Sequence, residues 1–261
     1  MPTNKQRREA AQRHLQRQLE RRVEQAQKRR RNLGIGLAAL ALVVVIGAAL
    51  LISGVLGGDD EDTEAAAPDD ASTCQYVPAD TTVNPDLTDV GVPDGDVPTS
   101  GTQALTMTTN YGDIGLTLDQ EAAPCAAGAI SYLAEQGFFD GTDCHRLTDS
   151  PGLQVLQCGD PSGTGRGGAA FDYPTAATGV TETYPRGTIA MANSGQGDDG
   201  SQFFLVYGDS LEGNPNYTVV GTIDEPGLGV LDAIAAKGIA EGGQDGAPVE
   251  PVTIESMTLA P

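Results

Sequence analysis

The run "ALTMTTNYGDIGLTL", residues 104–118, decides the fold class of this chain. Two stretches of alternating apolar and polar residues, "ALTMTT" and "DIGLTL", flank the short turn "NYG". Alternation with a period of two predicts strands with one buried face, and the turn predicts that the two strands pair as an antiparallel hairpin. Similar runs follow, namely "GTIAMAN", "SQFFLVY", "YTVVGTI" and "VTIESMTL". We therefore expect a mainly β domain over residues 102–261, built as an antiparallel barrel or sandwich.

Two helical patterns interrupt these strands. The first covers about residues 122–136, with Pro124 near its start and Gly137 at its end. Proline is favoured in the first turn of a helix and glycine just past its last turn. The second, "GLGVLDAIAAKG" at residues 227–238, places three apolar side chains on one face. We expect both helices to pack against the strands.

The N-terminal part of the chain predicts a membrane anchor. Residues 1–32 hold eleven Lys or Arg and three Glu, while "LGIGLAALALVVVIGAALLISGVL", residues 33–56, has no charge. At about 1.5 Å per residue, this helix would exceed the roughly 30 Å hydrocarbon core of a bilayer. A retained span is favoured over a cleaved signal peptide or a buried helix because the apolar run is long. The cluster "KRRR" before it predicts a cytoplasmic N-terminus and an extracytoplasmic remainder.

The two segments beside this span are polar and differ in charge. The basic helix lacks the aromatic and base-reading residues of a nucleic-acid site, so we expect a solvated helix and no nucleic-acid partner. Residues 57–101 are rich in Asp, Pro, Thr and Gly and have little apolar periodicity. Their acids do not follow the calcium-loop spacing of an EF-hand. We expect a disordered acidic linker there.

Four cysteines follow the predicted span, in a compartment that permits disulfides. Three pairings are possible. Cys144 and Cys158 could face each other across a hairpin, and Cys74 with Cys125 would then tie the linker to the first helix. Free thiols are the alternative. We expect no metal site, because the cysteines form no close pair and His145 is the only histidine after the span.

Polar residues stand at the ends of two apolar runs. The pair His145–Arg146 enters an otherwise apolar hairpin, and Arg146 is one of only four basic residues after the predicted span. A neighbouring carboxylate could hold this isolated cation. Ser201 and Gln202 enter the run "SQFFLVY" in the same way. Polar groups in these places indicate a site.

Five separated motifs resemble those of the cyclophilins, a family of peptidyl-prolyl isomerases: "GFFDGTDCHRL", "QCGD", "GTIAMAN", "GSQFF" and "VVGTI", in this order. The resemblance covers roughly residues 103–258. With the basic helix, the span and the acidic linker, the chain is similar to the membrane-anchored cyclophilins of actinobacteria. The resemblance implies an eight-stranded antiparallel barrel closed by two helices, and an enzyme that accelerates rotation about X-Pro bonds.

The resemblance also implies the roles of individual residues. Arg146 is the donor to the twisted prolyl amide, and Gln157 and Gln202 hold its planar guanidinium. Phe204 forms the floor of the proline pocket. The substrate-binding set as a whole is His145, Phe204, Val155, Leu211, Ala192, Asn193, Gly163 and Tyr217. The substrates are proline-containing polypeptides outside the membrane, no cofactor is required, and we expect a monomer.

Two other functions remain open at the level of sequence. The chain could bind proline-containing peptides with little catalysis, as a receptor or holdase. The anchor and linker could instead be the functional part, placing the domain at an envelope assembly. The complete set of motifs favours the enzyme.

Overall fold

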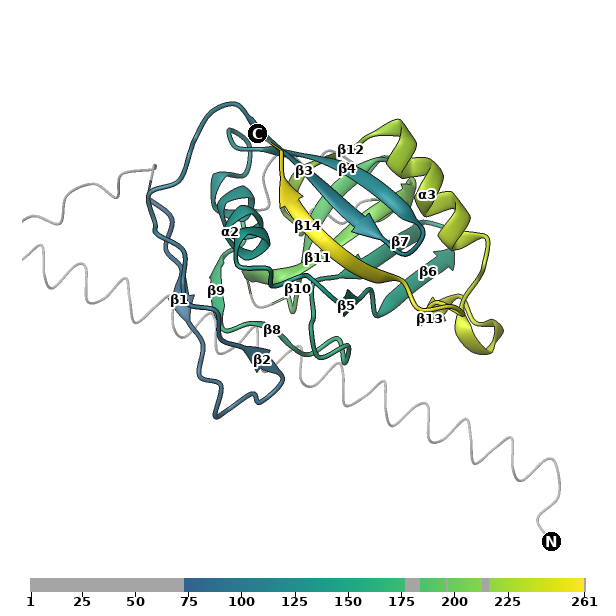
Figure 1. The fold of residues 1–261 in the computed structure, drawn as a ribbon, viewed down its shortest axis with the longest axis horizontal. Helices are drawn as coiled ribbons and strands as arrows, with labels where there is room; N and C mark the ends of the chain where they lie inside the picture. Colours follow the sequence, from purple (N-terminus) through teal and green to yellow (C-terminus); the bar gives the residue numbers. More distant parts are fainter. Residues whose placement is uncertain (1–72, 177–183, 196, 213–215, 261) are drawn as a thin grey trace, which may run out of the picture. The chain divides into compact units, whose positions relative to one another are not determined.

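The computed structural model describes residues 73–176, 184–195, 197–212 and 216–260 (Figure 1). The predicted basic helix at 1–32, the predicted anchor at 33–56 and the predicted linker up to residue 72 lie outside these ranges. Within the described ranges, no helix is long and apolar enough to cross a membrane.

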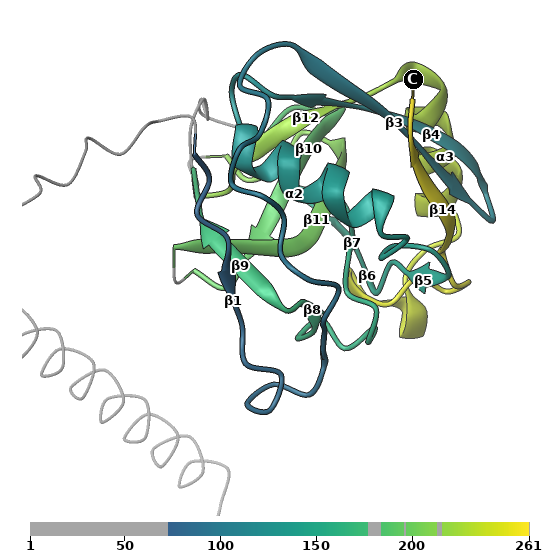
Figure 2. The same ribbon diagram turned by 60° about the vertical axis from the view of Figure 1, so that its left-hand side comes forward.

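Eight strands of five or more residues form one curled antiparallel sheet (Figures 1 and 2). The hairpin predicted from residues 104–118 is its first part, with Leu105 opposite Leu116 and Met107 opposite Ile114. These four side chains are almost fully buried, as the alternation predicts. The eight strands are β3 (Thr102–Thr109), β4 (Gly112–Asp119), β6 (Arg146–Ser150), β7 (Leu153–Cys158), β10 (Thr188–Asn193), β11 (Asp198–Gly208), β12 (Val219–Ile223) and β14 (Thr253–Leu259).

The sheet curls like a barrel, but its described strands do not close a ring. Shorter strands complete the set: β1 (Val77–Pro78), β2 (Leu87–Thr88), β5 (Thr142–Asp143), β8 (Gly168–Ala169), β9 (Phe171–Pro174) and β13 (Asp245–Gly246). The order of hydrogen-bonded neighbours in the sheet is β13-β6-β7-β11-β10-β12-β4-β3-β14-β5. The strands at its two ends, β13 and β5, are not paired with each other. Only Cys144 and His145 separate β5 from β6, so these strands follow one another instead of pairing. The predicted mainly β, antiparallel architecture with two helices is confirmed, and its sheet is a curled half-barrel.

Two helices cover the sheet, and both were predicted within about three residues. Helix α2 (Pro124–Glu135) packs on β14, β11 and β4, while α3 (Glu225–Ala235) packs on β4 and β11. Proline occupies the first turn of α2, and Gly137 follows it with φ +65°. Asp224 caps α3, because its Oδ1 accepts from the backbone N–H of Gly227 at 2.8 Å. A short 3-10 helix, η1 (Ala240–Gly242), precedes β13.

Residues 73–101, which we call the extension, are folded onto the sheet, so the predicted disordered linker is wrong from residue 73 onward. Strand β1 pairs with β9, and β2 runs parallel to β8. The hydroxyl of Tyr132 on α2 donates to the carbonyl of Val90 at 2.6 Å. These bonds join residues far apart in sequence. Order that depends on long-range bonds produces no periodic pattern in an Asp- and Pro-rich segment. The sequence therefore predicted disorder for these residues.

Both disulfides take one of the three possible pairings. Cys74 bonds to Cys125 and so ties the extension to α2. Cys144 bonds to Cys158 across the β6–β7 region. The predicted pairing of Cys144 with Cys158 and of Cys74 with Cys125 is confirmed, and the alternative of free thiols is wrong.

Strand β11 sends alternate side chains into two separate apolar clusters. Phe203 and Leu205 belong to the main core with the helices, and both are almost fully buried. Phe204 and Val206 point the other way, into a smaller cluster with Val155, Tyr184 and Ala190. This second cluster lies beneath the polar residues of β6 and β7 and forms the base of the site.

Candidate active site

Strand pairing brings Arg146 and Gln157 together. Arg146 begins β6 and lies directly opposite Gln157 on β7, so both side chains project from the same face. The Arg146 Nη1 donates to Gln157 Oε1 at 3.0 Å. Gly152, with φ +80°, lies in the turn that joins the two strands.

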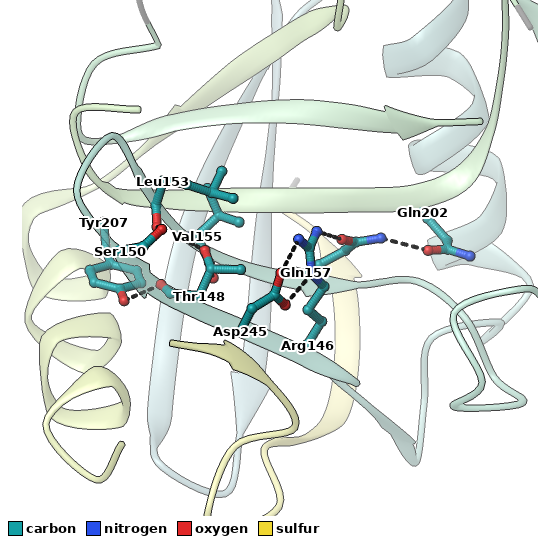
Figure 3. A network of polar contacts seen from close by, with 9 residues as sticks. All are labelled: Arg146, Thr148, Ser150, Leu153, Val155, Gln157, Gln202, Tyr207 and Asp245. Carbon is teal, nitrogen blue, oxygen red and sulfur yellow. Dashed lines mark hydrogen bonds and ion pairs between the residues drawn. The ribbon is translucent and has the colours of Figure 1, made fainter. Parts of the chain in front are cut away.

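The hydrogen bonds continue through a third polar residue (Figure 3). Gln157 Nε2 donates to Gln202 Oε1 at 2.8 Å, and Gln202 Nε2 donates to the carbonyl of Gly167 at 2.8 Å. An arginine can only donate, so it fixes the oxygen of the first amide and thereby the orientation of the second. The two glutamines predicted to support Arg146 thus form one directional chain from the guanidinium to the segment at Gly167.

Asp245, on the short strand β13, holds the other edge of the guanidinium. Arg146 Nε donates to Asp245 Oδ1 at 2.7 Å and Nη2 donates to Oδ2 at 2.8 Å. This two-point pairing matches the planar fork of arginine to a carboxylate. The hydrogen bond raises the pKa of Arg146 and lowers the pKa of Asp245, so both groups are charged at neutral pH. The sequence indicated that some carboxylate could hold this cation, but it did not identify Asp245.

These contacts do not use every N–H donor of the Arg146 guanidinium. Arginine has five N–H groups, and within the described ranges three of them bond to Asp245 and Gln157. The side chain is 36% exposed. Two N–H groups can therefore point toward a bound molecule while the plane of the group stays fixed.

A small cavity of about 180 Å³ opens beside Arg146. It is smaller than the roughly 300–1,000 Å³ of sites for drug-sized ligands, so it suits one compact group. Eight of the eleven residues predicted for catalysis or substrate binding line it. The full lining is Arg146, Leu153, Val155, Gln157, Ala192, Asn193, Phe204, Leu211 and Tyr217. Leu153 is the member that the sequence analysis missed.

Aromatic rings build the floor of this cavity. Phe204 and Tyr217 meet edge to face with ring centroids 5.3 Å apart, and the buried Tyr184 contacts both. The Tyr184 hydroxyl accepts from the backbone N–H of Tyr217 at 3.0 Å and donates to its carbonyl at 3.1 Å. Leu211 adopts φ +59°, a left-handed conformation that costs a non-glycine residue about 1–3 kcal/mol. The hydrogen bonds of Tyr184 thus fix the backbone of Tyr217, and Leu211 lines the same cavity.

Three predicted residues lie outside this lining. Gln202 joins it through its hydrogen bond to Gln157. His145 lies beneath the glycine-rich loop at residues 163–168, where a side chain at Gly165 would touch its ring. Burial lowers the pKa of His145, and its Nδ1 has no hydrogen-bond partner among the described residues. Gly163 lies in the same loop and does not line the cavity, so neither residue is placed to touch a molecule bound there.

Comparison with known families accounts for this arrangement. Residues 104–259 match the model of cyclophilin type peptidyl-prolyl cis-trans isomerases. This chain is a cyclophilin. The probable peptidyl-prolyl cis-trans isomerase B of Mycobacterium leprae is 43% identical over 99% of this chain and 100% of its own length. The protein of the same description from Mycobacterium tuberculosis is 48% identical over 72% of this chain, which spans only 64% of that protein.

Solved structures support the same membership. The structure of the Cryptosporidium parvum cyclophilin type peptidyl-prolyl cis-trans isomerase is similar to this cyclophilin with a TM-score of 0.54 and 25% identity. The match covers 62% of this chain and 99% of that one. A second structure of that protein, determined in the presence of the dipeptide Ala-Pro, matches with a TM-score of 0.53 and 25% identity, over 61% of this chain and 99% of that one.

Removing the carboxylate of Asp245 should weaken catalysis by this cyclophilin. We expect Asp245→Ala to lower kcat/KM for an X-Pro peptide about fivefold, because the guanidinium loses the partner that fixes its plane. Asp245→Asn keeps one acceptor oxygen and should lose less. Isomerase assays at equal concentrations of folded protein measure both effects.

The chain provides a matched control for this experiment. Asp232 also forms a two-point ion pair, with Nη1 and Nη2 of Arg186, and the side chains of Asp232 and Asp245 are 57% and 55% exposed. Asp232→Ala should leave kcat/KM unchanged. Equal activities of Asp245→Ala and Asp232→Ala would show that Asp245 does not position Arg146.

Proposed function

We propose that this chain accelerates cis-trans rotation about X-Pro bonds in exported proteins by stabilising the twisted amide with Arg146. The observation that carries this proposal is a fixed cation beside a cavity of one-residue size that has an aromatic floor. Arg146 is held by Asp245 and Gln157, and the cavity floor is Phe204. The Ala-Pro dipeptide in the Cryptosporidium parvum study supports proline-containing peptides as the substrate class.

The chemistry follows from the barrier to rotation. An amide must lose its resonance to rotate, which costs about 18–20 kcal/mol and makes X-Pro exchange take tens to hundreds of seconds. As the bond twists, the prolyl nitrogen becomes pyramidal and gains a lone pair. A fixed N–H donor aimed at this nitrogen binds the twisted state better than the planar one, and so accelerates rotation.

The cavity positions the amide for this donor. A proline ring against Phe204 would bring its nitrogen to the edge lined by Arg146. Ala192 and Asn193 also line the cavity and would hold the peptide backbone there. Rotation breaks no covalent bond, so it requires no proton transfer and no cofactor.

Exchange NMR on a short Ala-Pro peptide tests the proposal. The full-length chain, purified in detergent with its disulfides formed, should raise the exchange rate far above that of the free peptide. Shifted peptide resonances without faster exchange would contradict the enzyme and identify a peptide-binding module instead.

We also propose that the isomerase domain lies outside the cytoplasmic membrane as a monomer, anchored by residues 33–56. The uncharged run of 24 residues and the basic cluster before it support this orientation. Two disulfides in the domain fit an oxidising compartment. Protease added to intact cells should cleave the domain while sparing the N-terminal residues. Protection of the domain would refute this location.

A further inference from the structure

A second and larger cavity adjoins the proline pocket. Its volume is about 650 Å³, and it shares Gln157, Ala192 and Asn193 with the smaller cavity. One wall comes from the glycine-rich segment and the start of β11. The other wall comes from the extension, through Ala79, Asp80, Val83, Asn84 and Leu87. We call this cavity the extension groove.

The extension wall is fixed at both of its ends. At its first residue, the backbone N–H of Ala79 donates to the carbonyl of Ala170 at 2.8 Å. At its last residue, Leu87 pairs with Gly168 between β2 and β8. In the middle, Asn84 Nδ2 donates to the carbonyl of Arg166 at 3.0 Å. The groove is therefore a formed feature of the fold, and its far side is the Gly167 segment that accepts from Gln202.

Apolar side chains of the extension line one part of this groove. Val83 is 80% exposed and is one of the most exposed large apolar residues in the described part of the chain. It lines the groove together with Ala79 and the partly buried Leu87. An exposed valine at the edge of a groove offers contact to the aliphatic part of a ligand.

Carboxylates line the other part of the groove. Asp172 and Asp198 project from β9 and β11, and Asp80 projects from the extension. Asp80 accepts hydrogen bonds from Thr82, but Asp172 and Asp198 face the groove without an ion pair to any described Lys or Arg. Partial desolvation and the neighbouring Asp198 raise the pKa of Asp172, as expected for two close carboxylates without a counter-cation.

The remaining charge in the lining does not neutralise this pair. Arg166 is the only basic residue of the lining, against three carboxylates. The other described cations are Arg146, Arg186 and Lys237, and each forms an ion pair elsewhere. The groove therefore combines an apolar stem-binding part with excess negative charge.

We propose that the extension groove binds a lysine or arginine side chain of the substrate polypeptide, close in sequence to the isomerised proline. The shared wall at Ala192 and Asn193 allows one extended peptide, rising about 3.3–3.6 Å per residue, to fill both cavities. Long basic side chains bury an aliphatic stem while their charged end meets carboxylates. The proposal rests on the isomerase function and adds a specificity determinant that the extension supplies.

Peptide substrates with one varied residue test this inference. The substrates are alanine-based heptapeptides with a central proline. In each peptide, one of the three positions on either side of the proline carries Lys, Gln or Ala. For the full-length chain at low salt, we expect kcat/KM to be about fivefold higher for Lys than for Gln at one position. Equal values for Lys and Gln at every position would overturn the proposal, while turnover of these peptides would still support the isomerase function.

Variants assign the preference to the groove. In the double variant Asp172→Asn with Asp198→Asn, the Lys-to-Gln ratio should fall to about one. Asp113→Asn with Glu255→Gln removes the same charge from exposed positions on β4 and β14 and should leave the ratio unchanged. Val83→Ser should lower kcat/KM about twofold for Lys and Gln peptides relative to Ala. A Lys preference that survives in the first double variant would refute the assignment.

Discussion

Replacing Arg146 with alanine should lower kcat/KM for an X-Pro peptide by about 100- to 1,000-fold, the usual effect of removing a donor aimed at a transition state. The loss should fall mainly on kcat, because the donor binds the twisted amide more strongly than the planar substrate. The part of the cavity that Phe204, Val155 and Leu211 line remains in the variant, so peptide binding should persist. Exchange NMR measures turnover and binding in the same sample.

The fold should tolerate this substitution. Arg146 and Asp245 are both partly exposed, so water can replace their ion pair, and we expect a change of about 1 kcal/mol or less in the free energy of unfolding. Arg146→Lys keeps the charge but lacks the planar fork, so it cannot pair with Asp245 at two points while also donating to Gln157 and to the substrate, and it should recover little activity. Arg186→Ala removes an arginine with a similar two-point ion pair away from the cavity and should remain fully active. An Arg146→Ala variant with more than a third of the wild-type kcat/KM would refute the mechanism.

Local pattern predicted the parts of the site that lie on long strands. Alternation along β11 separates Phe203, in the main core, from Phe204, which lies at the cavity as predicted. The family motifs placed Arg146, Gln157 and Gln202 together, and their hydrogen bonds join them. Each of these residues lies at a regular position on one of three paired strands, so the sequence motifs could predict that their side chains lie close together.

The parts that the sequence did not reveal depend on long-range contacts. Asp245 lies on a two-residue strand, 99 positions after Arg146, where no periodicity can indicate which way its carboxylate points. Tyr184 reaches the backbone of Tyr217 from a single isolated bridge to Ser210.

The extension is the largest part of the structure that the sequence did not reveal. We expect the Cys74–Cys125 disulfide to keep much of it ordered. We expect the double variant Cys74→Ser with Cys125→Ser to lower the free energy of unfolding by about 4 kcal/mol at most. The bridge closes a loop between positions 51 residues apart, and the chain-entropy model gives about this value for that length. Chemical denaturation of the full-length chain measures the loss.

Hydrogen exchange separates this effect from general destabilisation. In the Cys74/Cys125 variant, protection at Ala79 and at β2 should fall further than protection in β3 and β4, because the extension is then held only by short strands and a few side-chain bonds. Replacing Cys144 and Cys158, which are 14 residues apart, should destabilise the protein while leaving the extension relatively protected. The Cys74/Cys125 variant should also lose part of its preference for basic peptides, because one wall of the extension groove loosens. Unchanged protection at Ala79 would show instead that strand pairing alone holds the extension, and that the bridge only limits the unfolded chain.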